Sequence, residues 1–154
     1  MLAVFDIDGV VADVRHRLHH LDWPMSWRGF FEEAGADPLL SEGARLVADL
    51  GREHDIVWVT GRPEWLRGLT ADWLAENGLP GGELHLRPVQ DHRPARVYKL
   101  GVLRRLAPRG IAAFIDDDPE VVDTAVAAGF PAVLADWVPR TEALRNAQER
   151  LGRT

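Results

Sequence analysis

The sequence contains no cysteine, only one lysine and no long apolar segment. The absence of cysteine excludes a disulfide framework, a thiolate zinc site and catalysis by a cysteine nucleophile. The apolar run at the N-terminus is short, has acids inside it and has no basic residues before it. We therefore expect neither a signal peptide nor a membrane span, no membrane partner, and a cytoplasmic location.

An excess of positive charge is also absent, because the chain has 18 basic and 24 acidic residues and therefore a net charge of −6. The chain therefore has no overall basic field that could attract nucleic acid or an anionic membrane. Its 154 residues are 46% hydrophobic and 27% charged, which is average for a globular domain. A chain of this length can bury a core without disulfides or metals, so we expect one domain over residues 1–154.

Short apolar runs rich in β-branched and aromatic residues alternate along the chain with helical patterns. The expected strands are Leu2–Ile7, Asp55–Thr60, Glu83–Leu86, Ile111–Ile115 and Pro131–Ala135. The expected helices are Glu42–Leu50, Pro63–Asn77, Arg96–Leu106, Pro119–Ala128 and Thr141–Leu151. This alternation predicts an α/β fold with a doubly wound, Rossmann-like parallel sheet of about five strands. Residues 12–40 are too many for an unstructured loop and predict a small helical cap insertion above the first strand.

Two aspartates end the first expected strand. Asp6 and Asp8 are two residues apart, so they point to one face of the strand and repel each other unless a cation lies between them. A cluster of oxygen ligands favours a hard cation such as Mg²⁺.

A second acidic group, residues 116–118, follows another expected strand in the same position. The two groups can meet at the carboxyl ends of the strands if those strands are neighbours in the sheet. Asp118 precedes Pro119 and fits a helix N-cap, which leaves Asp116 and Asp117 as candidate metal ligands.

Candidate phosphate ligands lie at the same edge of the sheet. Thr60 ends an expected strand, and Gly61 and Arg62 offer backbone donors and a guanidinium at the start of the next helix. Lys99 is the only lysine beside 17 arginines, which is consistent with a point contact to one anionic oxygen. The alternatives are a surface ion pair for Arg62 and a solvated helix charge for Lys99.

The cap region is rich in histidine and aromatic residues. His16, His19 and His20 share one face of a helix, which allows a metal site, a substrate contact or packing within the cap. No nearby acid completes a metal ligand set. The aromatic residues between 23 and 31 are spaced for a small core, and stacking on a nucleobase is the alternative.

Together these residues resemble a known family. The segment DIDGV at residues 6–10, Thr60 in VTGR, Lys99 and the Asp116–Asp117 pair resemble, in order, the four motifs of the haloacid dehalogenase (HAD) superfamily of phosphohydrolases. The resemblance covers residues 4–118, and Val10 stands where the family usually has threonine. The wider context, VRHRLHHL and VTGRPE, is similar to the phosphatase domain of phage-type polynucleotide kinases.

The resemblance implies a covalent mechanism. Asp6 would be the nucleophile that forms an aspartyl-phosphate, and Asp8 the general acid and then the base. Mg²⁺ would be held by metal ligands from both acidic groups, namely Asp6, the main-chain carbonyl of Asp8, Asp116 and, directly or through water, Asp117. Substrate would be held by Thr60, Gly61, Arg62, Lys99 and, from the cap, Arg17.

The function that these expectations favour is a Mg²⁺-dependent phosphomonoester hydrolase. Its substrate would be a phosphorylated small molecule or a nucleic-acid end, including a nucleotide or polynucleotide 3′-phosphate. The alternatives are a phosphorylatable receiver-type signalling domain and a non-catalytic phosphate-binding module. A receiver would place its lysine last, whereas Lys99 precedes the second acidic group here, and a receiver has no place for the insertion at 12–40.

Overall fold

The computed structural model describes all residues, 1–154, and confirms the predicted doubly wound α/β fold. Five parallel strands form one sheet in the order β3-β2-β1-β4-β5. The strands are β1 (Leu2–Phe5), β2 (Asp55–Pro63), β3 (Glu83–Arg87), β4 (Ile111–Asp116) and β5 (Ala132–Leu134).

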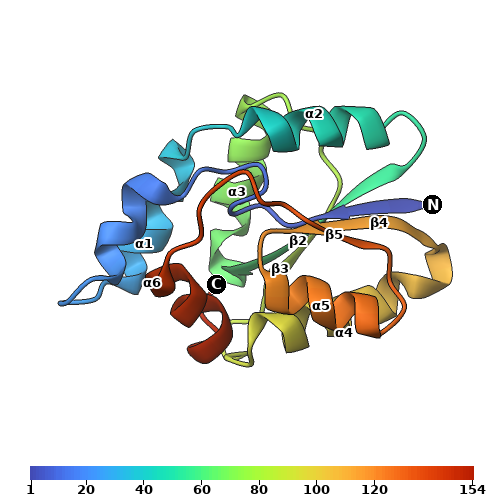
Figure 1. Ribbon diagram of the computed structural model, residues 1–154. Helices are drawn as coiled ribbons and strands as arrows, with labels where there is room; N and C mark the ends of the chain where they lie inside the picture. Colours follow the sequence, from blue (N-terminus) through green and yellow to red (C-terminus); the bar gives the residue numbers. More distant parts are fainter.

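Helices cover both faces of the sheet (Figure 1). One face is covered by α2 (Ser41–Leu50) and α3 (Arg67–Glu76), and the other by α4 (Ala95–Leu106) and α5 (Pro119–Ala127). The chain then ends with the short α6 (Glu142–Arg145) and the π-helical turn η5 (Asn146–Arg150). No helix has the length and apolar character needed to cross a membrane.

The central strand β1 is buried on both faces, as a strand inside a parallel sheet must be. Ala3 and Phe5 point into the core under α2 and α3, whereas Leu2 and Val4 point into the core under α4 and α5. This alternation explains why the run is apolar at every position rather than at every second one.

The sheet order makes β1 and β4 neighbours. Phe5 pairs with Ile115, and the Asp6 N–H donates to the Ile115 carbonyl at 2.9 Å. The chain runs outward from β1 through β2 to β3 and then returns to the other side of β1, so a topological switch point lies between β1 and β4. Ligands of open α/β sheets bind at such points, beyond the carboxyl ends of the strands.

Three short helices lie beyond the carboxyl ends of the strands (Figure 1). They are η1 (Arg15–Leu21), α1 (Trp27–Glu32) and η2 (Glu33–Ala36), which we call the cap. The Ser26 hydroxyl caps α1 by accepting the Gly29 N–H at 3.1 Å. The cap packs on the rest of the protein through a small hydrophobic cluster, in which Leu21, Phe30, Phe31 and Ala34 of the cap meet Leu66, Leu86 and Ala147.

Several boundaries differ from the sequence prediction. Strand β1 ends at Phe5, and the helix expected from Pro63 begins as the 3-10 turn η3 (Glu64–Leu66) and continues as α3. Strand β2 continues three residues past Thr60, because Pro63 still pairs with Arg87 of β3. Gly61 and Arg62 therefore lie in an extended strand, and the prediction that they begin a helix is wrong. The expected helix 141–151 is divided into α6 and η5, because its hydrogen bonding changes to the π pattern after Arg145.

Candidate active site

A buried lysine links the two acidic groups at the switch point. Lys99 Nζ lies 2.8 Å from Asp6 Oδ2 and 2.7 Å from Asp116 Oδ2. Lys99 projects from α4, Asp6 follows β1, and Asp116 ends β4. All three side chains are almost fully buried, with at most 3% of each side chain exposed. The interpretation of Lys99 as a solvated charge is therefore wrong.

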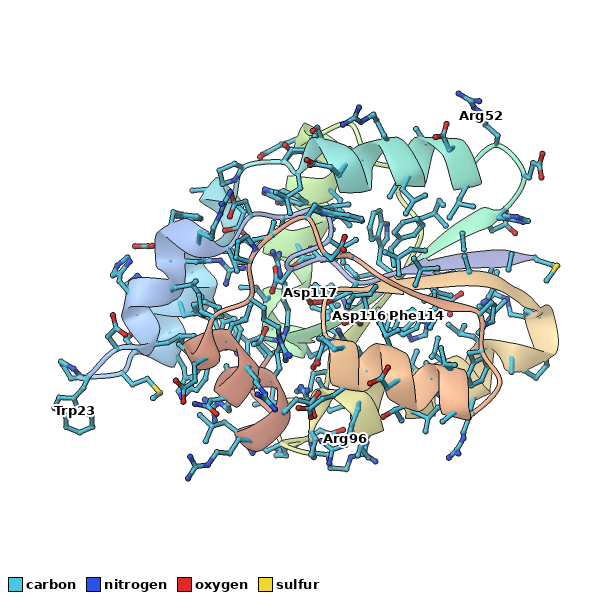
Figure 2. The ribbon with its side chains drawn as sticks, in the orientation of Figure 1. Trp23, Arg52, Arg96, Phe114, Asp116 and Asp117 are labelled. Carbon is cyan, nitrogen blue, oxygen red and sulfur yellow. The ribbon has the colours of Figure 1, made fainter.

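Asp117 completes a group of three carboxylates. One oxygen from each of Asp6, Asp116 and Asp117 lies within 4.8 Å of the others. Figure 2 shows Asp116 and Asp117 pointing into the middle of the molecule. Asp117 Oδ1 is buried and has no hydrogen-bond partner. An unpartnered buried carboxylate oxygen is costly, so this group fits a hard cation such as Mg²⁺.

Gly9 is required for the approach of Asp117. Its backbone has φ +77°, and a Cβ atom there would lie 2.1 Å from Asp117 Oδ2. Any side chain at position 9 would push Asp117 out of the carboxylate group. The glycine of the DIDG segment therefore allows the turn with positive φ and also leaves space for the Asp117 carboxylate.

Burial and mutual repulsion make these carboxylates hard to ionise. Burial, partly offset by Lys99 and reinforced by Asp116 and Asp8, raises the pKa of Asp6 to about 7. Burial likewise raises the pKa of Asp116 and, well above its ordinary value, that of Asp117. Burial disfavours the charged form of Lys99, but Asp116 and Asp6 outweigh it and raise the lysine's pKa. The site needs more positive charge than one lysine supplies.

Asp8 turns away from this group and meets two buried arginines. Arg62 Nη2 lies 2.7 Å and Arg17 Nη2 3.1 Å from Asp8 Oδ1. Both arginine side chains have 0% exposure. Burial would raise the pKa of Asp8, but the Arg62 and Arg17 guanidiniums overcome it and lower that pKa. A surface ion pair for Arg62 is therefore excluded.

Asp37, which the sequence analysis did not single out as a site residue, completes a four-member ion-pair ring. Its carboxylate lies 2.8 Å from Arg17 Nε and 3.1 Å from Arg62 Nη2. His16 Nε2 lies 2.6 Å from the same carboxylate. The ring joins the cap to β1 and β2. Asp8 and Arg17 are 9 residues apart, but the other contacts of the ring join residues 20 to 54 apart, so no local pattern could reveal it.

Thr60 and Gly61 lie beside this ring on β2. Thr60 is buried, and its hydroxyl accepts the backbone N–H of Arg62 at 3.2 Å, so that N–H is already occupied. Gly61 packs against the backbone of Thr154, where a Cβ would lie 2.0 Å from the carbonyl carbon. The structure thus places Thr60 and Arg62 at the edge that the sequence predicted, in a different backbone geometry.

Asp118 has the predicted capping role. Its side chain accepts the Glu120 N–H at 2.9 Å at the start of α5, with Pro119 as the first helical residue. Asp118 also lies 3.0 Å from Arg140 Nη2. The three consecutive aspartates therefore divide between the carboxylate group and the helix N-terminus.

A cavity of about 740 Å³ lies between the cap and the ends of β2 and β3, and none of the carboxylates or arginines described above lines it. Its wall combines aromatic and cationic side chains. They are Trp27, Phe31, Trp65, Arg28, Arg87, His92 and Arg153. Pro63, which directly follows Arg62, also lines the cavity. We call this feature the aromatic groove.

Comparison with known proteins identifies the fold. Neither a protein-family model nor a curated protein matches the chain. Solved structures do match, among them a Pnkp1/Rnl/Hen1 complex with 20% identity and a TM-score of 0.69 over 86% of this chain. The fold is that of haloacid dehalogenase-like hydrolases. The matched segment is 45% of that chain, so this chain spans less than half the length of its structural relative.

Two bacterial hydrolases share the same fold. The class C acid phosphatase from Bacillus anthracis, solved with tungstate, has 13% identity and a TM-score of 0.63 over 95% of this chain and 76% of its own. The HAD-hydrolase YfnB from Bacillus subtilis, bound to magnesium, has 13% identity and a TM-score of 0.59 over 86% of this chain and 87% of its own. These likenesses establish the architecture around the site.

Proposed function

We propose that the protein is a Mg²⁺-dependent phosphomonoester hydrolase that works through an aspartyl-phosphate. The observation that carries this proposal is the convergence of Asp6, Asp116, Asp117 and Lys99 at the β1–β4 switch point, with Asp8 two residues away. The fold shared with a class C acid phosphatase and a haloacid dehalogenase-like hydrolase supports the same reaction class.

The reaction requires two in-line displacements at phosphorus. A carboxylate oxygen of Asp6 forms a bond to phosphorus while the bond to the leaving oxygen breaks, and Asp8 donates a proton to that oxygen. Asp8 then removes a proton from a water molecule that attacks the aspartyl-phosphate. This second step releases phosphate, restores the Asp6 carboxylate and returns the proton to Asp8.

The arginines explain how Asp8 could alternate between the two protonation states. In the structure Arg62 and Arg17 hold Asp8 ionised, which suits a base but not an acid. A phosphate dianion entering the site would compete for both guanidiniums, because bidentate arginine–phosphate contacts are strong. Loss of these partners would leave Asp8 buried and raise its pKa toward the acid form. We therefore place Arg17 and Arg62 among the substrate ligands.

The remaining phosphate ligands come from β2 and α4. Thr60 and Gly61 follow Val59 on β2, whose Trp58 pairs with Phe5 directly before Asp6, and Lys99 already contacts Asp6. A hydroxyl, a backbone N–H and an ammonium group would hold the three non-bridging oxygens. Such preorganised donors supply most of the catalysis in phosphoryl transfer.

Mg²⁺ suits the residues that are present. Asp6, Asp116 and Asp117 supply carboxylate oxygens, one of which has no protein partner, and the main-chain carbonyl of Asp8 is the fourth expected ligand. A bound Mg²⁺ would neutralise charge on the phosphoryl group and between the carboxylates. The pKa values of the three carboxylates are raised because nothing neutralises all of their charge. A bound cation would stabilise the ionised carboxylates and lower these pKa values.

The aromatic groove favours a nucleic-acid end as the substrate. Trp65 is 51% exposed, although a large aromatic side chain is normally buried. Arg153 stacks on Trp27 at 5.1 Å, which adds a cation to the aromatic wall. Aromatic platforms flanked by arginine bind single strands without strong sequence preference. Two structural neighbours are Pnkp1/Rnl/Hen1 complexes, one described as an RNA repair complex, which agrees with this choice.

The reaction class is tested with a generic aryl phosphate in the presence and absence of Mg²⁺. Asp6→Asn is expected to abolish turnover and keep the fold, because an amide has nearly the same shape but cannot attack phosphorus. Asp55→Asn, at the exposed opposite end of β2, is the matched control and should retain full activity.

The outcomes separate the alternatives. A receiver-type domain would take up one phosphoryl group per chain without turnover, and a phosphate-binding module would do neither. Full activity of Asp6→Asn would contradict the assigned nucleophile.

The substrate class is tested by comparing a 3′-phosphorylated oligonucleotide, a nucleoside monophosphate and a sugar phosphate. Trp65→Ala should lower kcat/KM for the oligonucleotide about tenfold, since stacking contributes about 1–3 kcal/mol per base. The rate with the sugar phosphate should not change. An equal loss for all three substrates would mean that Trp65 supports the fold and not the substrate.

A further inference from the structure

The cap gathers a second set of metal-ligating groups, away from the buried carboxylates. Ligand atoms of His19, His20 and Glu33 lie within 4.8 Å of one another. The histidines lie in η1 and Glu33 begins η2. The sequence alone offered the histidines without an acid, and the fold supplies it from 13 residues further along the chain.

The His19 ring is held in a tautomer suited to metal binding. Its Nδ1 lies 3.1 Å from the carbonyl oxygen of His16. A carbonyl can only accept, so Nδ1 carries the proton and Nε2 keeps its lone pair. A ring N–H donated to a backbone carbonyl is the usual outer contact of a metal-bound histidine.

The His20 ring is fixed in place by packing. It lies over Gly29, where a Cβ atom would be 2.6 Å from Nδ1, and its centroid is 4.1 Å from that of His19. His20 Nε2 lies 3.0 Å from Glu33 Oε1. The imidazole and the carboxylate therefore already face each other at about the distance that separates two ligands of one ion.

We propose that His19, His20 and Glu33 bind a divalent transition-metal ion, with Zn²⁺ as the ion whose chemistry fits best. Two imidazoles and one carboxylate form a three-ligand zinc set that leaves a position for water. The all-oxygen group at Asp6, Asp116 and Asp117 suits Mg²⁺ instead, so the two sites select different ions. A tetrahedral ion with bonds of about 2.1 Å needs ligand atoms about 3.4 Å apart, which small rotations of the exposed His19 ring and of the 44% exposed Glu33 side chain can provide.

Metal binding here would fasten the cap to the catalytic site. The helix η1 that carries both histidines also carries Arg17, and η2, which begins at Glu33, ends before Asp37. Arg17 and Asp37 form the buried ion pair beside Asp8. An ion joining η1 to η2 would therefore stabilise the segment that positions Arg17. This inference does not depend on the proposed phosphatase reaction.

The test is Zn²⁺ binding by calorimetry, with the full chain in excess Mg²⁺ so that the carboxylate group is already occupied. One Zn²⁺ per chain is expected, with a rise in melting temperature. His19→Ala and His20→Ala should each weaken binding more than tenfold. His19 is exposed, so its replacement leaves the fold intact.

The matched control is His85→Ala. His85 and Glu83 form a histidine–glutamate pair at 2.7 Å on β3 with no third ligand, so its loss should not affect Zn²⁺ binding. Co²⁺ gives a second readout, because a tetrahedral site produces strong visible absorption that should be absent in His19→Ala. The proposal is overturned if the wild-type chain binds no Zn²⁺, if the cap variants bind it as well as the wild type, or if only Asp117→Asn loses it.

Discussion

At the scale of single residues, the site depends on side chains whose charge is balanced inside the protein. Arg17 and Arg62 are fully buried and share the carboxylates of Asp8 and Asp37. Each guanidinium reaches several partners at once, which a planar fork allows and a point charge does not. Because the two arginines are neutralised only by Asp8 and Asp37, an incoming anion could compete with these carboxylates for the guanidiniums.

Arg62→Lys is expected to destabilise the protein by about 2–4 kcal/mol. The ammonium can reach one carboxylate but not Asp8, Asp37 and the Thr70 hydroxyl together, so buried partners would be left unsatisfied. Urea unfolding measures the change in the free energy of unfolding. The control is Arg52→Lys, an exposed residue paired with Asp49, which should change that free energy by less than about 0.5 kcal/mol. Equal stability of the two variants would show that the buried fork is not needed.

At the scale of elements, the last turn η5 is attached to the N-terminus of α5 by a carboxyl pair. Glu149 is 7% exposed, and its Oε1 and Asp118 Oδ2 are both buried without conventional partners. Burial, a hydrogen bond with Asp118 and the charge of Asp118 raise the pKa of Glu149 to about 8, although Arg96 opposes them. With a pKa of about 8, the Glu149 carboxyl is mostly protonated at neutral pH.

This pair predicts a pH-dependent loss of stability. The folded pKa of Glu149 lies above its unfolded value, so its stabilising contribution is complete below about pH 4.5 and is lost as pH rises to about 8. Glu149→Gln cannot ionise and should be more stable than the wild type by about 2 kcal/mol at pH 9, with no such gain at pH 5. Thermal unfolding at the two pH values checks this. A constant difference between the proteins would mean that Glu149 does not titrate in this range.

Elements differ in how well the sequence predicts them. Four strands follow from apolar runs that end in acids or glycine, whereas β3 was expected as an edge strand from the weaker pattern at Glu83–Leu86. Each strand lies within a few residues of its predicted place. The predicted end of β2 was wrong because the last residue pair, Pro63 with Arg87, joins two strands and leaves no pattern in the local sequence. The change from α6 to the π-helical η5 likewise depends on tertiary packing around residues 141–150, which the local sequence does not reveal.

At the scale of the whole molecule, the order of the strands determines whether the two acidic groups meet. The sequence predicted that they would meet only if their strands were neighbours in the sheet. Asp6 and Asp116 meet because β4 lies next to β1, and both strands are equally apolar whichever neighbours they have. The Asp8–Arg17–Asp37–Arg62 ring could not be predicted, since it joins three distant segments. The same is true of Glu33, whose place beside His19 and His20 depends on how the cap folds back.

The charge distribution of the whole molecule predicts how an oligonucleotide should bind. The net charge is −6, so attraction of a phosphate backbone depends on local cations such as Arg28 and Arg153 of the aromatic groove. Arg28 is paired with Glu32 at 2.6 Å, and a phosphate would replace that exposed partner. About two contacts to a single strand give a slope of about −1.4 for log K against log salt concentration.

Binding is measured by fluorescence anisotropy with a labelled oligonucleotide that lacks a terminal 3′-phosphate, so that Arg17, Arg62 and Lys99 do not add to the slope, and with the inactive Asp6→Asn chain. Arg28→Gln should reduce the magnitude of the slope by about 0.7. Arg109→Gln, which removes an exposed arginine paired with Glu83 at the other end of β3, should leave the slope unchanged. A slope near zero would leave only stacking in the groove, and one steeper than about −4 would require a broad basic surface elsewhere. Either result would contradict binding by two arginines beside an aromatic wall, because that arrangement limits both the number of phosphates contacted and the salt released.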